Sequence, residues 1–208
     1  LDEGEKIPNN LKQFDVMFCM GGPMDTWMEE KYPWLIEEKK KIKEFVVDLK
    51  KPYLGFCLGC QLLGEVLGGK VIKSNPAEIG IMDVNFFRNK KEDNLFADYP
   101  EQIKALQWHS YEVTNLENNN NVTLIASSKT TKYQIFKYQN HAYGIQFHIE
   151  VKDNTVSDWC CVPEYKSALE EQFGKDALKK FEKDAKDNMK SMNKFSKILY
   201  SNFKNKFF

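Results

Sequence analysis

The chain has 208 residues, enough for one sizeable α/β domain or at most two small ones. Hydrophobic residues make up 42% and charged residues 29%, as in ordinary globular proteins, and 30 basic residues balance 30 acidic ones. Zero net charge argues against nucleic acid or an anionic membrane as the main partner, because neither would attract the chain over long range.

The first third of the chain predicts alternating strands and helices. An apolar run at 14–20, followed by Gly21-Gly22-Pro23, predicts a strand buried on both faces. The elements expected next are a helix at 32–49, a strand at 53–56, a helix at 58–67 and a strand at 70–73. This alternation indicates a parallel sheet covered by helices.

The rest of the chain predicts more strands and then one long helix. The strands are expected at 81–87, 103–113, 122–127, 133–138 and 142–149. From about 175 to 204, apolar residues recur at steps of three, four or seven, which predicts an amphipathic packing helix. Because no repeat or linker interrupts the sequence, residues 1–208 are expected to form a single domain.

Two further features of the sequence concern its cellular setting. No apolar run approaches the roughly 20 residues that span a bilayer, and the polar start does not resemble a signal peptide. The five cysteines are odd in number and are not spaced like a disulfide framework. Reduced thiols in a cytoplasmic enzyme are therefore expected.

A candidate nucleophile, Cys57, lies between a predicted strand and a predicted helix. A nucleophile on such a sharp turn needs small neighbours two residues away on either side, and Gly55 and Gly59 supply them. The turn would place the sulfur at a helix N-terminus, where the dipole favours thiolate over thiol. The N–H of Leu58 would point at the same space and could hold an oxyanion.

Other interpretations of Cys57 remain open at this point. Cysteine next to glycine is common in protein cores, and Cys57-x-x-Cys60 could be a redox pair or half of a metal site. A redox pair would leave Gly55, Gly59 and Gln61 unexplained. A zinc site would need further ligands, and the sequence has no second CxxC or His pair. Neither a metal nor a cofactor is therefore expected.

The base that a nucleophilic cysteine needs must come from three histidines. His148 ends an apolar run, so it should lie at the carboxyl edge of a strand, where catalytic groups gather in α/β sheets. Glu150, two residues on, projects to the same side of an extended segment and could orient the imidazole. His109 and His141 have no carboxylate two residues away. By itself, His-x-Glu also fits a strand-end histidine without a catalytic role.

Several segments resemble the class I, or triad, glutamine amidotransferases. Gly55-x-Cys57-x-Gly59-x-Gln61 looks like the nucleophile motif of that family, and residues 144–150 resemble its histidine–glutamate motif. Residues 21–24 are similar to its oxyanion strand, and residues 107–110 to the GMP-synthase-like branch. The resemblance runs from about residue 1 to 159 with the family's order and spacing.

The resemblance implies an α/β, flavodoxin-like fold with a mostly parallel sheet and helices on both faces. It also implies that Cys57 attacks the side-chain amide of glutamine, while His148, oriented by Glu150, protonates the departing ammonia. The other implied contacts are Gly22 and Leu58 for the oxyanion, and Gln61, Ser110 and Tyr111 for the substrate.

The sequence departs from the family pattern at three places. Ile149 stands where the family usually has Pro, and it supplies an extra N–H. Ser110 stands where relatives often have Gly. The family's first strand, helix and strand would precede Leu1, so the chain is expected to be a fragment of a longer enzyme. The run at 14–20 would then be an exposed sheet edge, soluble only if another segment or chain covers it.

The sequence therefore predicts a glutamine-hydrolysing amidotransferase. A synthase subunit is the expected partner, and the molecule that accepts the ammonia is unspecified. A γ-glutamyl peptidase would use the same fold and triad on a γ-glutamyl compound. A catalytically silent binding subunit is the alternative from a different class.

Overall fold

The computed structural model describes residue 1 and residues 3–208, with only the backbone at residues 89 and 90. Its residues form two compact units. Unit 1 comprises Leu1–Ile72, Glu112–Leu124 and Ile135–Gln146, and unit 2 comprises Lys73–Tyr111, Ile125–Gln134 and Phe147–Phe208. Both units combine distant segments of the chain, and the single domain expected from the sequence stays a prediction.

Unit 1 is built on a parallel group of strands. Its strands are β1 (Met17–Cys19), β2 (Tyr53–Phe56), β6 (Ile135–Tyr138) and β7 (Ala142–Ile145). β2 pairs in parallel with β1 and with β7, and β6 pairs antiparallel with β7. Every residue of β2 and β7 is buried, which explains their unbroken apolar sequences.

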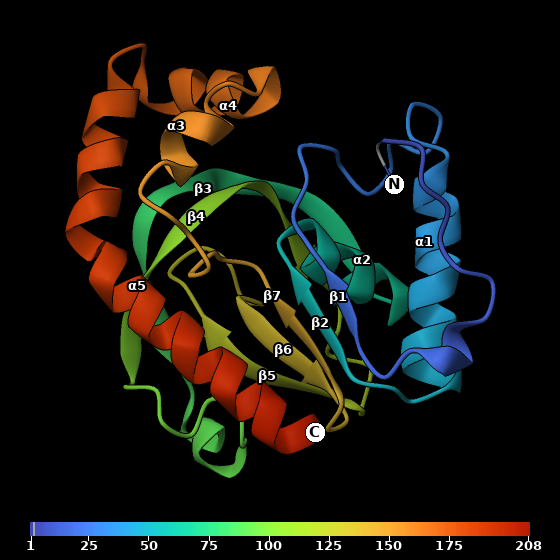
Figure 1. Cartoon of the computed structure of the whole chain (residues 1–208). Coiled ribbons are helices and arrows are strands. Elements are labelled where there is room, and N and C mark those ends of the chain that lie inside the picture. The colour runs from blue at the N-terminus through green and yellow to red at the C-terminus, as the bar shows by residue number, and fades with distance from the viewer. Residues whose placement is uncertain (2) are drawn as a thin grey trace. The chain divides into compact units, whose positions relative to one another are not determined.

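Two helices accompany these strands. α2 (Leu58–Val66) packs against β1, β2 and β7, and α1 (Trp34–Lys43) packs against α2 (Figure 1). α1 continues into a π-helical turn, η2 (Glu44–Asp48), so the two together fill most of the helix expected at 32–49.

Unit 2 contains most of β3 (Lys70–Phe86) and β4 (Gln102–Thr114) and half of β5 (Val122–Ser127). These strands have the order β5-β3-β4, and β3 pairs antiparallel with β5. The strands expected at 70–73 and 81–87 are thus one strand. The α/β class expected from the sequence is confirmed, with a sheet that is mixed because its later strands pair antiparallel.

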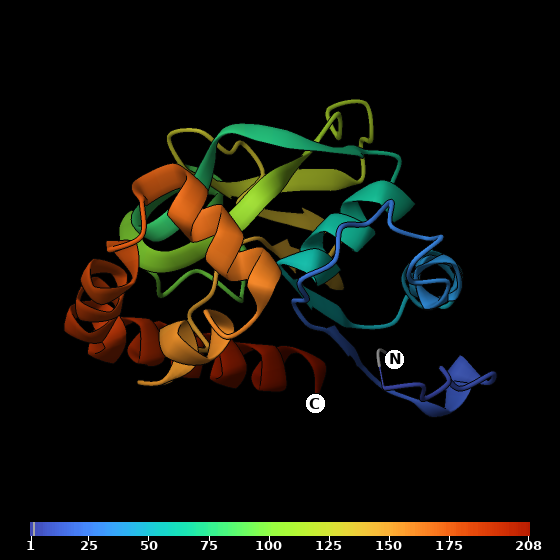
Figure 2. The same ribbon diagram turned by 90° about the horizontal axis from the view of Figure 1, so that it is seen from above.

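Unit 2 also contains a short 3-10 helix, η3 (Arg88–Glu92), and the helices α3 (Thr155–Trp159), α4 (Pro163–Phe173) and α5 (Ala177–Phe207). Figures 1 and 2 show α3 and α4 beside α5, and both helices pack against it. Neither α3 nor α4 is expected from the sequence. α3 is only five residues long and α4 buries only Leu169, so neither has a visible apolar stripe.

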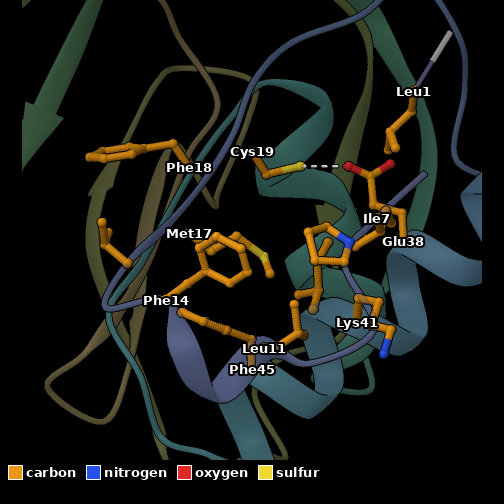
Figure 3. Close-up of a pocket in the computed structure, with 13 residues that line it drawn as sticks. Leu1, Ile7, Leu11, Phe14, Met17, Phe18, Cys19, Glu38, Lys41 and Phe45 are labelled. Atoms are coloured by element: carbon orange, nitrogen blue, oxygen red, sulfur yellow. Dashed lines mark hydrogen bonds between the residues drawn. The ribbon is translucent and has the colours of Figure 1, made fainter. Parts of the chain in front are cut away.

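The sheet edge expected at 14–20 is confirmed for a shorter strand, Met17–Cys19, but the burial on both faces expected for this run is wrong. β1 ends the strand order, and among the described residues it pairs with β2 alone. Phe18 is 49% exposed. A cavity of about 280 Å³, lined mainly by apolar side chains, lies beside β1 (Figure 3). Inside it, the Cys19 thiol donates to Glu38 across 3.0 Å, and burial together with the Glu38 charge raises the pKa of Cys19.

No helix in the described part of the chain is both long enough and apolar enough to cross a bilayer.

Candidate active site

Cys57 occupies a strained turn in unit 1, between β2 and α2. Its backbone has φ 49° and ψ −103°, in a region that residues other than glycine rarely adopt. Its N–H donates to the carbonyl of Ile145 across 2.8 Å, which ties the turn to β7. A strained residue at a strand-to-helix turn is typical of a nucleophile elbow.

Two glycines make this turn sterically feasible. A Cβ on Gly55 would lie 2.5 Å from the carbonyl oxygen of Gly59. A Cβ on Gly59 would lie 2.2 Å from the carbonyl oxygen of Cys19. Neither backbone oxygen can move aside cheaply, so any larger residue would push the turn apart. The structure thus explains the glycine spacing noted in the sequence.

A chain of buried amides leads to the Cys57 sulfur. Nε2 of Gln146 donates to Sγ of Cys57 across 3.7 Å, and Nε2 of Gln61 donates to Oε1 of Gln146 across 3.3 Å. Gln146 is fully buried and Gln61 is 5% exposed. No role for Gln146 is predicted from the sequence. The one feature of the sequence that indicates such a role is the position of Gln146, a polar residue, within the apolar run 143–147.

The two residues expected to hold an oxyanion lie next to each other in unit 1. Leu58 is the first residue of α2, and N–H groups in the first turn of a helix have no partner within that helix. A Cβ on Gly22 would lie 3.2 Å from Cδ2 of Leu58. Unit 1 therefore brings together Cys57, Leu58, Gly22 and Gln61.

His148 and Glu150 form a close pair in unit 2. Nδ1 of His148 donates to Oε1 of Glu150 across 2.5 Å. The backbone N–H of Ile149 donates to Oε2 of the same carboxylate across 2.9 Å. Burial raises the pKa of Glu150, but the charge and hydrogen bond of His148 and two backbone N–H groups outweigh it, so the pKa is lowered.

Backbone and aromatic contacts fix the position of His148. It lies three residues beyond the end of β7 and exchanges two backbone hydrogen bonds with Leu106 of β4, at 2.8 and 3.1 Å. The ring of Trp159, at the end of α3, meets the imidazole edge-on with a centroid distance of 4.7 Å. His148 is 4% exposed. These contacts thus hold the ring of His148 in one orientation, whether the imidazole is neutral or charged.

Ser110 and Tyr111, the other two expected substrate contacts, also belong to unit 2. Both lie in β4 and border a cavity of about 410 Å³ whose other walls come from 73–77 and from α4. The structure thus divides the predicted site residues: four lie in unit 1, and His148, Glu150, Ser110 and Tyr111 lie in unit 2. The pairing of Cys57 with His148 stays a prediction.

The remaining cysteines have different surroundings. Cys60 is fully buried, and burial together with the charge of Cys57 raises its pKa, as expected for a core thiol. Its sulfur would lie 3.0 Å from a Cβ on Gly144, so it packs against β7. Cys160 and Cys161 lie at the exposed end of α3. These positions favour packing over the redox interpretation for Cys60.

Comparison with known proteins identifies relatives of the chain. The family model described as glutamine amidotransferase class-I matches residues 2–158. A glutamine-hydrolyzing GMP synthase subunit from Sulfolobus acidocaldarius is 34% identical over 149 residues, covering 71% of this chain and 73% of that protein. The putative glutamine amidotransferase-like protein YfeJ of Salmonella typhimurium is 30% identical over 149 residues, covering 71% and 61%.

Solved structures agree with these relatives. A glutamine amidotransferase from Thermotoga maritima superposes with a TM-score of 0.82 at 30% identity, covering 97% of this chain and 83% of that one. A second, from Methylobacillus flagellatus, has a TM-score of 0.79 at 20% identity and covers 98% and 81%, so it supports the fold alone. The expected flavodoxin-like α/β fold is consistent with both.

Proposed function

The chain belongs to the class-I glutamine amidotransferase family, in its GMP-synthase-like branch, and on this premise we propose that it hydrolyses the side-chain amide of glutamine through a cysteinyl thioester and releases ammonia. The observation that carries the proposal is the strained turn at Cys57, with φ 49°, held by glycines that no larger residue can replace. Such strain persists only where the surroundings maintain it, and it is concentrated at functional sites.

In the proposed reaction, Nε2 of His148 takes the proton of the Cys57 thiol, and the resulting thiolate attacks the side-chain amide carbon of glutamine. A C–S bond forms as the carbonyl electrons move to oxygen. His148 then gives its proton to the amide nitrogen, the C–N bond breaks, and ammonia leaves. Water attacks the thioester carbon, His148 takes one proton from that water, and the C–S bond breaks to release glutamate and regenerate the thiolate.

The other site residues support these steps. The N–H groups of Gly22 and Leu58 donate to the oxyanion, a contribution of about 3–4 kcal/mol for each donor. Glu150 keeps the proton of His148 on Nδ1 before the reaction and stabilises the imidazolium. Gln61 and the backbone around Ser110 and Tyr111 help to bind glutamine.

Ammonia release from glutamine tests the proposal directly. Wild-type protein is expected to turn over, Cys57→Ser is expected to lose nearly all turnover while still folding, and Cys60→Ser serves as the matched control. A glutamine analogue with an electrophilic carbon should label Cys57 alone. If it does not label the folded protein, a silent binding subunit becomes the better interpretation.

A second candidate is hydrolysis of γ-glutamyl compounds larger than glutamine, because the same fold and triad would cleave a γ-glutamyl bond. Steady-state kinetics on glutamine and on γ-glutamyl dipeptides would separate the two. A higher kcat/KM for the dipeptides would identify a γ-glutamyl peptidase.

The relative from Sulfolobus acidocaldarius is named as one subunit of a GMP synthase. We therefore extend the proposal to a separate synthase subunit that receives the ammonia. Affinity purification from the native host followed by mass spectrometry tests this, and recovery of the chain without any synthase would contradict it.

A further inference from the structure

The imidazole of His109 faces a hydrogen-bond acceptor at each nitrogen. His109 lies in β4 and is 5% exposed. Its Nδ1 is 2.9 Å from the carbonyl oxygen of Tyr111, and its Nε2 is 3.2 Å from Oε2 of Glu78. A carbonyl and an ionised carboxylate only accept hydrogen bonds, whereas a neutral imidazole has only one N–H to donate. Both bonds therefore require a ring that carries both protons and a positive charge.

The surroundings of Glu78 keep its carboxylate ionised. The residue is 2% exposed. Its Oε1 accepts from Ser128 across 2.5 Å and from Thr130, and its Oε2 accepts from Gln134 across 2.6 Å. Burial raises the pKa of Glu78, but hydrogen bonds from His109, Ser128 and Thr130 outweigh burial and lower the pKa to about 2. Together with the acceptors at both ring nitrogens of His109, these contacts describe a buried carboxylate–imidazolium pair.

This pair joins three segments of unit 2. Glu78 belongs to β3, His109 belongs to β4, and the hydroxyl and amide donors to Glu78 come from the connection after β5. The bond from Nδ1 to the carbonyl of Tyr111 attaches the next residues of β4 to this network. Ser110 and Tyr111 are the residues to which the proposed function assigns backbone contacts with glutamine.

We infer that His109 is a charged positioning residue for glutamine binding, which is held by Glu78 and sets the backbone of Ser110 and Tyr111. The inference rests on the proposed glutamine hydrolysis and names a determinant of substrate binding in that same site. His109 acts through the backbone and exchanges no proton with substrate. Its loss therefore raises KM and leaves kcat nearly unchanged.

Protonation of His109 is measured by ¹⁵N-resolved NMR of the imidazole rings in the whole chain, which requires no turnover. Both ring nitrogens of His109 are expected to carry protons at neutral pH. His141 is the internal comparison. Its Nε2 lies 2.9 Å from the carbonyl oxygen of Val46, and a ring with a single N–H is enough to make that bond. A His109 ring with a single proton at neutral pH would overturn the inference.

Kinetics of Glu78 variants test the positioning role. Glu78→Gln keeps the shape and removes the charge, so KM for glutamine is expected to rise roughly tenfold while kcat changes less than about twofold. Glu78→Asp restores the charge and should recover part of the loss. If folded Glu78→Gln has the wild-type KM, the inference is wrong, and if that variant does not fold, Glu78→Asp and the wild-type NMR decide.

Failure of the proposed function gives a different result. If wild-type protein releases no ammonia, glutamine hydrolysis is wrong, and the backbone amide resonances of Ser110 and Tyr111 then test the pair. They should shift in Glu78→Gln if the ion pair sets this backbone. Unchanged resonances would show that it does not.

Discussion

The backbone N–H of Ile149 donates to Oε2 of Glu150 across 2.9 Å, a bond that the family's usual proline could not make. The same carboxylate accepts from His148 through Oε1. Glu150 is therefore held at both oxygens by the two residues that precede it. The hydrogen bond from Ile149 thus adds local rigidity at the carboxylate that orients His148.

Ile149→Pro should weaken this arrangement without abolishing it. Loss of the N–H removes one of the interactions that lower the pKa of Glu150, so the acidic limb of the kcat profile should move to higher pH. We expect kcat to fall about two- to fivefold at neutral pH. Ile149→Ala keeps the N–H and is the matched control. Equal effects of the two substitutions would assign the loss to side-chain packing, since Ile149 is 1% exposed.

Glu150→Gln should affect chemistry far more than binding. An amide cannot stabilise the imidazolium that His148 becomes during turnover. We expect kcat to fall at least about a hundredfold, with little change in KM. The measurement is steady-state ammonia release at saturating and at low glutamine. A change confined to KM would instead place Glu150 in substrate binding.

Gln146→Leu should slow the chemistry of Cys57 because the leucine removes the donor to its sulfur. An N–H directed at sulfur favours the thiolate, so both alkylation by iodoacetamide and kcat should fall, by about tenfold. Gln61→Leu, which removes the donor to Gln146, should have a smaller effect of the same kind. If Gln61→Leu raises KM for glutamine and Gln146→Leu does not, Gln61 contacts the substrate directly.

The parts of the site that the sequence predicted are those with short-range patterns. The turn at Cys57 follows from glycines two residues away, and the His148–Glu150 pair from a spacing of two. The role of His109 could not be found in this way, because its carboxylate partner, Glu78, lies 31 residues away in another strand. Carboxylates two residues from a histidine are visible in the sequence, whereas a partner brought close by strand pairing is not.

Two features of the fold were missed for similar physical reasons. Tertiary packing, not periodicity, stabilises α3 and α4. The ring of Trp108 in β4 contacts Trp159 of α3 and Tyr165 of α4, so aromatic packing joins both helices to β4. Trp108 also contacts Phe181 of α5. The segment 70–86 forms one strand through Gly80, whose φ of 131° is a conformation that other residues rarely adopt, where the sequence suggested a break.

Glu78→Gln should reduce the dependence of stability on acid pH. The pKa of Glu78 is lowered from its ordinary value of 4.5 to about 2 by hydrogen bonds that outweigh burial. A depressed pKa stabilises the folded state above the ordinary value, and this stabilisation is lost as the pH falls from about 4.5 toward 2. Its size is about 3 kcal/mol.

Urea unfolding at about pH 6 and about pH 2.5 measures this dependence. The free energy of unfolding should fall less between these pH values in Glu78→Gln than in wild type. Glu171→Gln, at an exposed carboxylate of α4, is the control and should match wild type. Equal pH dependence in Glu78→Gln and wild type would show that Glu78 is not a buried ionised group.

Phe18→Lys should reduce self-association of the chain. Among the described residues β1 pairs with β2 alone, and Phe18 projects from this edge with 49% of its surface exposed. An exposed apolar edge strand is a template for pairing with another chain, and a lysine at such an edge opposes pairing because its charge would be desolvated. Sedimentation velocity over a range of concentrations should show less association in Phe18→Lys than in wild type.

Ile36→Lys is the matched control. Ile36 is 42% exposed on α1, so a lysine at this position adds the same charge away from the sheet edge. If both lysines reduce association equally, net charge is responsible and the edge of β1 is not the contact. An effect specific to Phe18 would identify β1 as the surface through which copies of this chain meet.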